Sequence, residues 1–323
     1  MKNLARDAPA RPTLELRCSE MTPQLLVFGE ALIDLKTSSA LAFQGFVGGS
    51  PLNVALASAR LGLPSALATR VSTDFFGAEI TELLVNNGVN TDFLERGAEP
   101  STLAFVNVAG DGTPSYSFRF LETSTLAYSA QLELPANLRS IHYGGSLNPL
   151  FEPISSRVLS VMRGFAGLKH FDPNVRPAVL GDIPAYRTRL EPWWDSADWV
   201  KMSLEDFEFL YPDSSEADFA ASLIARGVRV VTVTDGGKGA RLYRAGRTPL
   251  EVSAPNISVV DTVGAGDTFS GATIAKLLEL DVDLETVTDD VLLEVLGFAA
   301  TAAAINCTRA GCDPPIRAEI AAF

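Results

Sequence analysis

The sequence predicts an α/β protein with a mostly parallel central sheet, helices on both faces of that sheet, and a small separate β-sheet. From about residue 138 onward, short apolar segments typical of strands alternate with segments typical of helices. This alternation is the pattern of parallel sheets covered by helices. Polar residues also follow successive strands, at 172–176, 201–206 and 234–239. Polar strand ends of this kind predict a ligand cleft along one edge of the sheet.

The small sheet is predicted by a hairpin pattern in the first half of the chain. Residues 101–109 and 115–120 are rich in β-formers, and Gly110–Thr113 reads as the connecting turn. With about 36–47, these segments would form a lid over a ligand. The sequence contains no internal repeat or long linker, so we expect one domain over 23–323, preceded by a flexible extension at 1–22.

The individual elements follow from apolar periodicity and from glycine and proline boundaries. Strands are expected at 24–28, 41–47, 65–71, 140–143, 168–172, 199–202 and 228–234. Helices are expected from about 50 to 61, 74 to 88, 153 to 165, 205 to 211, 215 to 226, 267 to 280 and 290 to 305.

Composition excludes several classes of function. The net charge of −13 over 323 residues argues against nucleic-acid binding and against binding to an anionic membrane surface. No apolar stretch approaches the roughly 18 residues of a membrane span, and the first twenty residues lack the apolar region of a signal peptide. Three cysteines, Cys18, Cys307 and Cys312, make no disulfide framework. A reducing, cytoplasmic location is expected, and His142 and His170 are interpreted as core histidines.

The motif Asp261–Gly271 organises the chain. A β-branched run at 259–260, interpreted as a strand, leads into a Gly-x-Gly turn and a long helix from Asp267. Free N–H groups and the positive end of the dipole make such a helix start an anion site. No lysine follows, as a P-loop would need, and the glycine spacing differs from a dinucleotide fingerprint. An acid beside an anion site suits a base that deprotonates a nucleophile attacking phosphate; the alternative is a helix cap without chemistry.

A second glycine motif spans Gly48–Asn53. Ser50 is predicted as the N-cap of a helix and Pro51 as its first residue. Two glycines allow a close backbone approach to a ligand, and Asn53 in the first turn would face that ligand. Asp34, near the end of the first strand, is another candidate. A simple helix entry and a turn-capping acid remain the alternatives.

These two motifs together resemble the ribokinase-like, or PfkB, family of carbohydrate kinases. Their order, their separation of about 200 residues and the polar strand ends are similar to that family, over about Leu25 to Pro314. The resemblance implies a ribokinase-like fold and transfer of a phosphoryl group from ATP to a sugar. It also implies Mg²⁺ and K⁺ as cofactors.

The resemblance implies a role for each matching residue. Asp267 would be the general base, and the backbone amides of Gly264, Ala265 and Gly266 would hold the transferring phosphoryl group. Sugar-binding positions would be Asp34, Gly48, Gly49, Asn53 and Arg176. Nucleotide-binding positions would be Ser203, Thr234, Gly236 and Gly239. Asp206 would hold Mg²⁺ through water, and Asp261 would hold a monovalent cation together with carbonyls of the loop near 307–312.

The sequence departs from the family pattern at two places. Ser203 and Asp206 stand where an Asn-x-x-Glu motif is common, and Ser72 stands where a glycine is common. The motifs at 29–34, 142–147 and 172–176 are most similar to the fructokinase branch, so fructose is the expected sugar. Ribokinase, 2-keto-3-deoxygluconate kinase, nucleoside kinase and a catalytically idle sugar-binding protein are the alternatives. A homodimer through the lid sheet is a further hypothesis.

Overall fold

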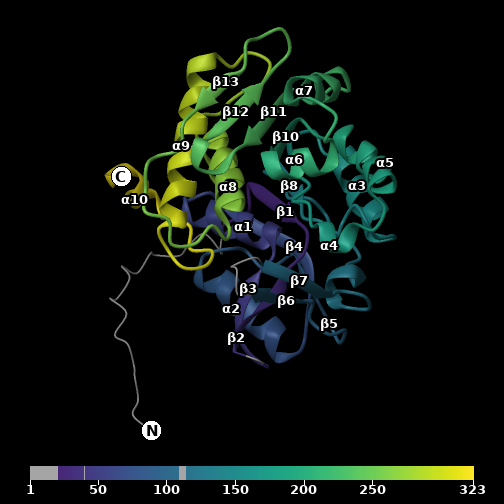
Figure 1. Ribbon diagram of the computed structural model, residues 1–323. Helices are drawn as coiled ribbons and strands as arrows, with labels where there is room; N and C mark the ends of the chain where they lie inside the picture. The colour runs from purple at the N-terminus through teal and green to yellow at the C-terminus, as the bar shows by residue number, and fades with distance from the viewer. Residues whose placement is uncertain (1–20, 40, 109–113) are drawn as a thin grey trace.

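The computed structural model of the protein describes residues 21–39, 41–108 and 114–323 (Figure 1). Its largest feature is a nine-stranded sheet in the order β13-β12-β11-β10-β9-β8-β1-β4-β5. The strands are β1 (Leu25–Phe28), β4 (Ser65–Ser72), β5 (Leu94–Gly97), β8 (Ser140–Gly144), β9 (Leu168–Asp172), β10 (Trp199–Ser203), β11 (Val230–Thr234), β12 (Ala240–Tyr243) and β13 (Leu250–Val252). Neighbours from β5 to β11 are parallel, while β12 and β13 are antiparallel additions.

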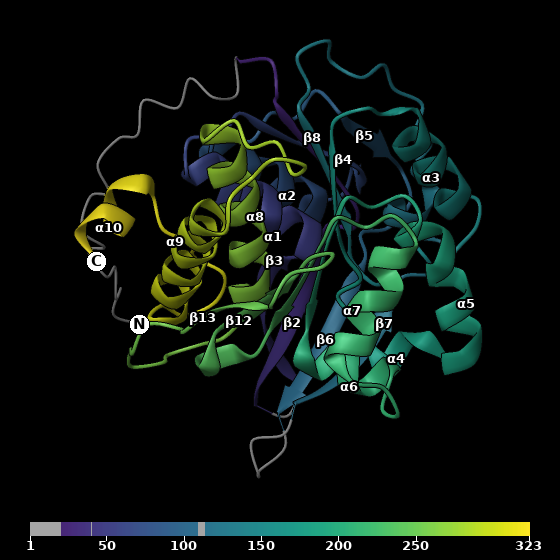
Figure 2. The ribbon, with the colours of Figure 1, turned by 90° about the horizontal axis from the view of Figure 1, so that it is seen from above.

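Helices cover both faces of this sheet, as Figure 2 shows. One layer contains α1 (Ser50–Arg60), α2 (Phe75–Asn86), α8 (Ala265–Glu279) and α9 (Asp289–Cys307), and the other contains α3 (Ile154–Gly164), α5 (Ile183–Trp194), α6 (Leu204–Leu210) and α7 (Glu216–Ala225). Side chains of a strand alternate between the two faces. In β1, Leu25 and Val27 therefore pack with the first layer, whereas Leu26 and Phe28 pack with the second. The predicted fold class is confirmed.

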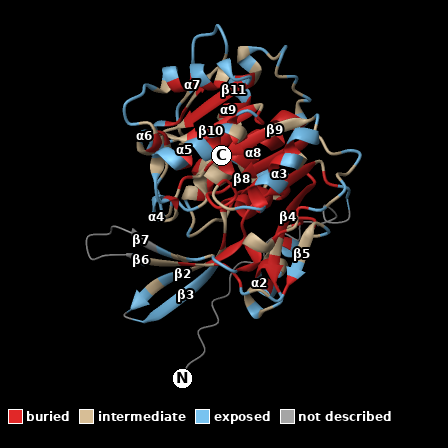
Figure 3. Ribbon diagram, turned by 90° about the vertical axis from the view of Figure 1, so that its right-hand side faces the viewer, coloured by how far each residue is buried: buried red, intermediate tan, exposed pale blue. Residues whose placement is uncertain are grey.

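A four-stranded sheet projects from this body, in the order β3-β2-β6-β7. Its strands are β2 (Leu32–Ser39), β3 (Ala42–Gly48), β6 (Leu103–Val108) and β7 (Pro114–Arg119). Most of β3 is exposed to solvent, in contrast to the buried central strands (Figure 3). The expected small sheet is present, and β2 begins several residues before the range expected for it.

Several expectations about local structure were wrong. Val259 and Val260 form no strand: both are exposed, and the Val260 N–H donates to the Cys307 carbonyl at 2.8 Å. β-Branched residues favour strands only where neighbouring strands are available to pair with them. Asp34 lies inside β2 of the small sheet and not at the end of β1. The short elements β5, β12, β13, α4 (Pro177–Leu180) and α10 (Arg317–Ala322), as well as α5, had not been predicted.

Helix α9 qualifies the expectation that the chain contains no possible membrane span. By length and composition alone its 19 residues could cross a membrane. Half of its most apolar window is buried inside the protein, and it packs against α8 in the first helical layer. Burial against other helices accounts for its apolar character, as in the core helices of many globular proteins.

The histidines and cysteines follow the prediction where the structure describes them. His142 and His170 lie fully buried on neighbouring strands, with their Nδ1 atoms 2.9 Å apart. Cys307 and Cys312 are free thiols. Cys18 and nearly all of the expected extension at 1–22 fall outside the described residues.

Candidate active site

The two glycine motifs meet where α1 and α8 begin side by side (Figures 1 and 2). Asp267 lies in the first turn of α8. The Ser50 hydroxyl donates a hydrogen bond to Asp267 Oδ1 at 2.6 Å, and Asn53 Nδ2 donates to Asp267 Oδ2 at 2.8 Å. Segments more than 210 residues apart thus hold one carboxylate at the positive ends of two helix dipoles.

Glycines make this close junction possible. Gly49 has φ 114°, and a Cβ there would meet the Glu30 carbonyl oxygen, so a side chain would be both strained and obstructed. A Cβ on Gly271 would approach within 2.9 Å of both the Ala57 side chain and the Val54 carbonyl oxygen. The absence of a side chain at 271 therefore lets α1 and α8 pack closely enough for their first turns to share Asp267.

The capping prediction for α1 was wrong. The N-cap is Gly49, and Ser50 is already the first helical residue, with Pro51 second. The Ser50 hydroxyl is directed to the carboxylate of the neighbouring helix instead of to the backbone of its own helix. A serine beside Gly-Gly can serve either purpose, and only the position of α8 decides between them.

The glycine turn before α8 was expected to offer the backbone amides of Gly264, Ala265 and Gly266 as donors, and the Ala265 amide is already used. Gly264 is the N-cap, with a left-handed φ of 75°. The Ala265 N–H donates to the Thr262 carbonyl at 3.2 Å, so this amide is used inside the turn. Gly266 and Asp267 are among the first helical residues, whose N–H groups have no acceptor within the helix. Their position makes them the available donors for an anion.

A buried ion pair beside this turn had not been predicted as part of the site. Lys201 Nζ lies 2.9 Å from Asp172 Oδ2, and both side chains are at most 5 % exposed. A Cβ on Gly266 would lie 2.8 Å from Lys201 Nζ, so the ammonium group lies against the glycine turn. Burial lowers the pKa of Lys201, but the charge and hydrogen bond of Asp172, together with the charges of Asp267 and Asp206, outweigh burial and hold the pKa above its ordinary value. A lysine inside the apolar strand β10 was the available signal.

Several acids around this point have raised pKa values. Burial raises the pKa of Glu30 to about 7, against the opposing effect of backbone hydrogen bonds and of Arg176. Burial also raises the pKa of Asp34 to about 6, again opposed by Arg176. For Asp267, burial raises the pKa while the hydrogen bonds from Ser50 and Asn53 lower it. Acids with perturbed pKa values gathered near a cation are typical of a functional site.

The residues expected to hold metals have different surroundings. Asp206 Oδ2 accepts a hydrogen bond from the Val175 N–H at 3.2 Å, and burial followed by the Asp172 charge raises its pKa to about 6. No group of three or more His, Cys, Asp or Glu side chains suited to a metal occurs in the described part of the chain. Mg²⁺ is usually held by one or two carboxylates together with waters and phosphates. Asp206 fits that ion only as a partner to a nucleotide.

Asp261 lies against the loop expected to share its cation. Its carboxylate accepts hydrogen bonds from the N–H groups of Val263, at 3.1 Å, and Gly311, at 3.0 Å. Asn306, which directly precedes the 307–312 loop, donates a hydrogen bond from Nδ2 to the Val263 carbonyl at 2.8 Å. The structure therefore joins Asp261 to the 307–312 loop, and its role in holding a cation stays a prediction.

The expected nucleotide-binding residues lie at the carboxyl edge of the sheet. Ser203 and Thr234 are register partners at the ends of β10 and β11. The Ser203 hydroxyl accepts a hydrogen bond from the Asp206 N–H at 3.0 Å, which makes Ser203 the N-cap of α6. Gly236 and Gly239 flank the short turn after β11, with φ values of 47° and 110°. The turn brings exposed backbone to the same edge as the Asp206 carboxylate.

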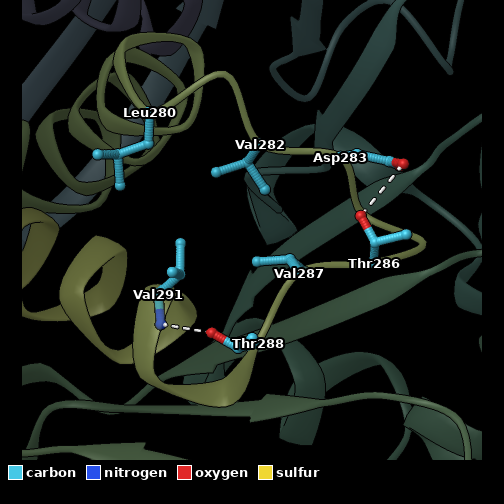
Figure 4. A pocket seen from close by; sticks show the side chains of 7 residues that line it. All are labelled: Leu280, Val282, Asp283, Thr286, Val287, Thr288 and Val291. Atoms are coloured by element: carbon cyan, nitrogen blue, oxygen red, sulfur yellow. Dashed lines mark hydrogen bonds between the residues drawn. The ribbon is translucent and has the colours of Figure 1, made fainter.

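The pocket in Figure 4 is separate from this junction. It has a volume of about 230 Å³ and lies between the end of α8 and the start of α9, lined by Leu280, Val282, Asp283, Thr286, Val287, Thr288 and Val291. Asp267 lies at the other end of α8, roughly 20 Å away at 1.5 Å per residue. The pocket is therefore not part of the candidate active site.

Comparison with known proteins decides the family. The family model described as pfkB family carbohydrate kinase matches residues 22–319. The chain belongs to the pfkB family of carbohydrate kinases. It is an ATP-dependent carbohydrate kinase, and the resemblance inferred from the two glycine motifs is confirmed.

Curated relatives and solved structures agree with this assignment. Fructokinase-1 of Oryza sativa subsp. japonica is 33% identical over 310 residues, covering 91% of this chain and 94% of the relative. Fructokinase of Rhizobium leguminosarum bv. trifolii is 31% identical over 275 residues, covering 78% and 79%. A crystal structure of fructokinase with bound ATP from Xylella fastidiosa has a TM-score of 0.84 at 28% identity, covering 94% of this pfkB kinase and 98% of that chain. Fructokinase from Vibrio cholerae O395, in a form with fructose, ADP and calcium ion, has a TM-score of 0.80 at 25% identity, covering 94% and 99%.

Proposed function

We propose that this kinase transfers the γ-phosphoryl group of ATP to the primary hydroxyl of free fructose, forming fructose 6-phosphate. The observation that carries the proposal is the Asp267 carboxylate, held by Ser50 and Asn53 where two helices begin. The choice of fructose is supported by the names of the relatives, which are fructokinases at about one-third identity over most of their length.

Asp267 acts as the general base in this mechanism. It accepts the proton of the sugar hydroxyl as the hydroxyl oxygen forms its bond to the γ-phosphorus, and ADP leaves with the electrons of the broken P–O bond. General-base catalysis typically contributes about 10²- to 10⁴-fold to a rate. A carboxylate that is partly desolvated, with a raised pKa, is a stronger base than one in water.

Residues around Asp267 bind the sugar. Asn53 Oδ1 is buried without a hydrogen-bond partner among the described residues, because Nδ2 of the same amide faces Asp267. Oδ1 is therefore an acceptor ready for a sugar hydroxyl. Asp34, Gly48, Gly49 and Arg176 complete the proposed sugar site. The Asp34 carboxylate lies against Gly48, where a Cβ would collide with it.

Backbone amides and the positive charge of a lysine stabilise the transferring phosphoryl group. In the Gly264–Gly266 turn, the Ala265 amide already donates to the Thr262 carbonyl, so the Gly266 amide is the donor left for the anion. Positioned donors of this kind are worth roughly 2.7–4 kcal/mol each in other enzymes. Phosphoryl transfer depends mostly on such positioning and charge stabilisation. The buried Lys201 ammonium adds a fixed positive charge behind the turn.

The nucleotide and its ions occupy the edge of the sheet next to this turn. Ser203, Thr234, Gly236 and Gly239 would line the ATP site, Asp206 would hold Mg²⁺ through water, and Asp261 would hold K⁺. The structures of the relatives include forms with ATP, with ATP and magnesium, and with fructose, ADP and potassium ion. When bound, Mg²⁺ neutralises charge on the phosphates.

The four-stranded sheet is proposed as a lid over the sugar and as the surface of a homodimer. Phe43 and Phe46 on β3 are 41 % and 42 % exposed and lie on opposite faces of the strand. Exposed apolar side chains of this kind mark surfaces suited to association. Sedimentation velocity at micromolar concentration tests the dimer, and a monomer over the whole concentration range would rule it out.

An ADP-release assay with a panel of sugars tests the proposed reaction. The panel contains fructose, ribose, 2-keto-3-deoxygluconate and a nucleoside, with Mg²⁺ and with or without K⁺. Fructose is expected to give the highest kcat/KM, and preference for another member would reassign the substrate within the family. Sugar binding without ADP release from any member would indicate an idle binding protein. The variant Asp267→Asn should fold, bind sugar and lose at least about 10²-fold in kcat, whereas the exposed control Asp283→Asn should keep wild-type turnover.

A further inference from the structure

Ser50 uses its hydroxyl group on a neighbouring helix and not as a cap of its own helix. The residue is 6 % exposed and is the first residue of α1, whose N-cap is Gly49. A serine usually caps its own helix from the N-cap position, and Ser50 lies one residue beyond that position. It instead donates to Asp267 Oδ1 on α8, at 2.6 Å.

The two hydrogen bonds to Asp267 act on different oxygens. Ser50 holds Oδ1, while Asn53 holds Oδ2. Two donors on separate oxygens fix the plane of a carboxylate, and each oxygen keeps a further lone pair for a proton. Without Ser50, a single amide would hold the group, and the carboxylate could rotate toward the Lys201 ammonium beside the glycine turn.

We propose that Ser50 is a positioning residue for the phosphoryl transfer: its hydroxyl fixes the orientation of Asp267 and favours the ionised form of that base. The inference rests on the proposed function, in which Asp267 accepts the substrate proton. Hydrogen bonds to a carboxylate stabilise its charged form, and bonds to charged groups are stronger than neutral ones.

The charges around Asp267 make this stabilisation necessary. Burial raises the pKa of Asp267, and the hydrogen bonds from Ser50 and Asn53 oppose the rise. Asp172 raises the pKa further and Lys201 lowers it. The charged and titratable groups that face Asp267 come from several elements: Asp172 on β9, Lys201 on β10, Glu30 before β2, Asp34 within β2, and Cys312 in the loop after α9.

Burial raises the pKa of Glu30 to about 7 and the pKa of Asp34 to about 6. Their protonation also contributes to the acid side of a pH–rate profile. The role of Ser50 must therefore be measured as a difference between variants that share those two acids.

The test compares Ser50→Ala with Ser58→Ala and Ser50→Thr. Ser58 is a matched control because it lies on the same helix, is fully buried, and donates to the Gly271 carbonyl of α8 at 3.4 Å. The measurements are kcat and KM for fructose from pH 5 to 9, with thermal unfolding of each variant. For Ser50→Ala we expect kcat at pH 7 to fall about 10- to 100-fold, as for a lost hydrogen bond to a charged group. We also expect the acid limb of kcat to move up by roughly one pH unit, with KM nearly unchanged.

Ser58→Ala should keep the wild-type profile, and Ser50→Thr, which restores a hydroxyl, should recover most of the loss. A folded Ser50→Ala variant with wild-type kcat and an unmoved acid limb would overturn the inference. A uniform loss at every pH that Ser50→Thr does not recover would also overturn it, because that pattern indicates packing alone. Asp267→Asn separates the two levels of the argument. If that variant keeps turnover, the proposed function fails; if it is inactive while Ser50→Ala is normal, only the inference about Ser50 fails.

Discussion

The two sheets that meet at the active site differ in how firmly they hold their residues. The nine-stranded sheet is covered on both faces, and Lys201 and Asp172 near the site form a buried ion pair on it. The four-stranded sheet has an exposed strand, β3, and its neighbouring strand β2 carries Asp34. We therefore expect changes on the covered sheet and its helices to alter turnover and stability, and changes on the exposed sheet to alter sugar affinity or association.

Among the substitutions that test this difference between the sheets, Lys201→Met should have the largest effect on stability and kcat. It leaves the Asp172 carboxylate buried without its partner, and breaking a buried pair in this way costs about 3–5 kcal/mol of stability. We also expect kcat to fall, because the ammonium behind the glycine turn is lost. Urea unfolding and steady-state kinetics measure both effects.

Lys169→Met is the matched control for Lys201→Met. Lys169 forms a similar pair with Asp198, at 3.0 Å, but at the start of β9 and more exposed to solvent. This variant should lose less stability and keep its kcat. Equal losses in the two variants would show that the position beside the turn has no special importance.

Gly271→Ala should have an intermediate effect. The new Cβ meets the Ala57 side chain and the Val54 carbonyl oxygen at 2.9 Å, and overpacking of this kind costs about 1–3 kcal/mol. Because α1 must shift away from α8, the hydrogen bonds to Asp267 lengthen, and we expect kcat to fall along with the unfolding temperature.

The control for Gly271→Ala is Gly297→Ala in α9. No described heavy atom lies within 4 Å of a Cβ at Gly297, so alanine should stabilise the helix by roughly 0.5–1 kcal/mol. Kinetics should be unchanged there. A Gly271→Ala variant that behaved like Gly297→Ala would show that α1 and α8 can move apart without loss of stability or turnover.

The pH dependence of stability should reveal the two acids whose pKa values burial raises, Glu30 and Asp34. The pKa of Glu30 in the folded protein is about 7, above its ordinary value of 4.5, and that of Asp34 is about 6, above 3.8. Between the ordinary and the raised pKa values, the folded state therefore binds more protons than the unfolded state. The stability that protonated Glu30 and Asp34 contribute is lost as pH rises through about 6 to 7. Glu30→Gln should raise the unfolding temperature relative to wild type at pH 8, with the difference vanishing below about pH 4.

Asp34→Asn extends this test to the exposed sheet. It should show a similar convergence with wild type at low pH, because the same burial effect is removed. As Asp34 belongs to the proposed sugar site, KM for fructose should rise more than kcat falls. A pH-independent difference in unfolding temperature, for either variant, would mean that the acids are not perturbed as described.

Phe46→Ser should have the smallest effect on the folded chain. The side chain lies on exposed β3, and exposed substitutions usually change stability by less than about 0.5 kcal/mol. If the four-stranded sheet forms the dimer, sedimentation should shift toward monomer. Leu293→Ser, at a similarly exposed position on α9, should leave the assembly unchanged.

Most of the fold could be predicted because its signals are local. Apolar runs predict β1, β8, β9, β10 and β11. The Asp74 cap predicts the start of α2, and the two glycine motifs predict the starts of α1 and α8 to within two residues, although the cap expected for α1 was wrong. Short edge elements such as β12 and β13 were missed, since a three- or four-residue strand depends on the neighbour with which it pairs. The run at 259–260 was misassigned for the related reason that its β-branched residues lie outside any sheet.

In the candidate site, too, some features follow from local sequence and others depend on tertiary packing. The sequence by itself determined the family, the glycine turns and Asp267, because turns and helix starts depend on residue types next to each other in the chain. Only the tertiary structure decided that the Ser50 hydroxyl binds Asp267 and not its own helix, and that Asp34 belongs to the exposed sheet. It also decided that Lys201 lies behind Gly266. Hydrogen bonds between side chains more than 200 residues apart depend on how helices pack on the sheet, and no local pattern in the chain encodes that packing.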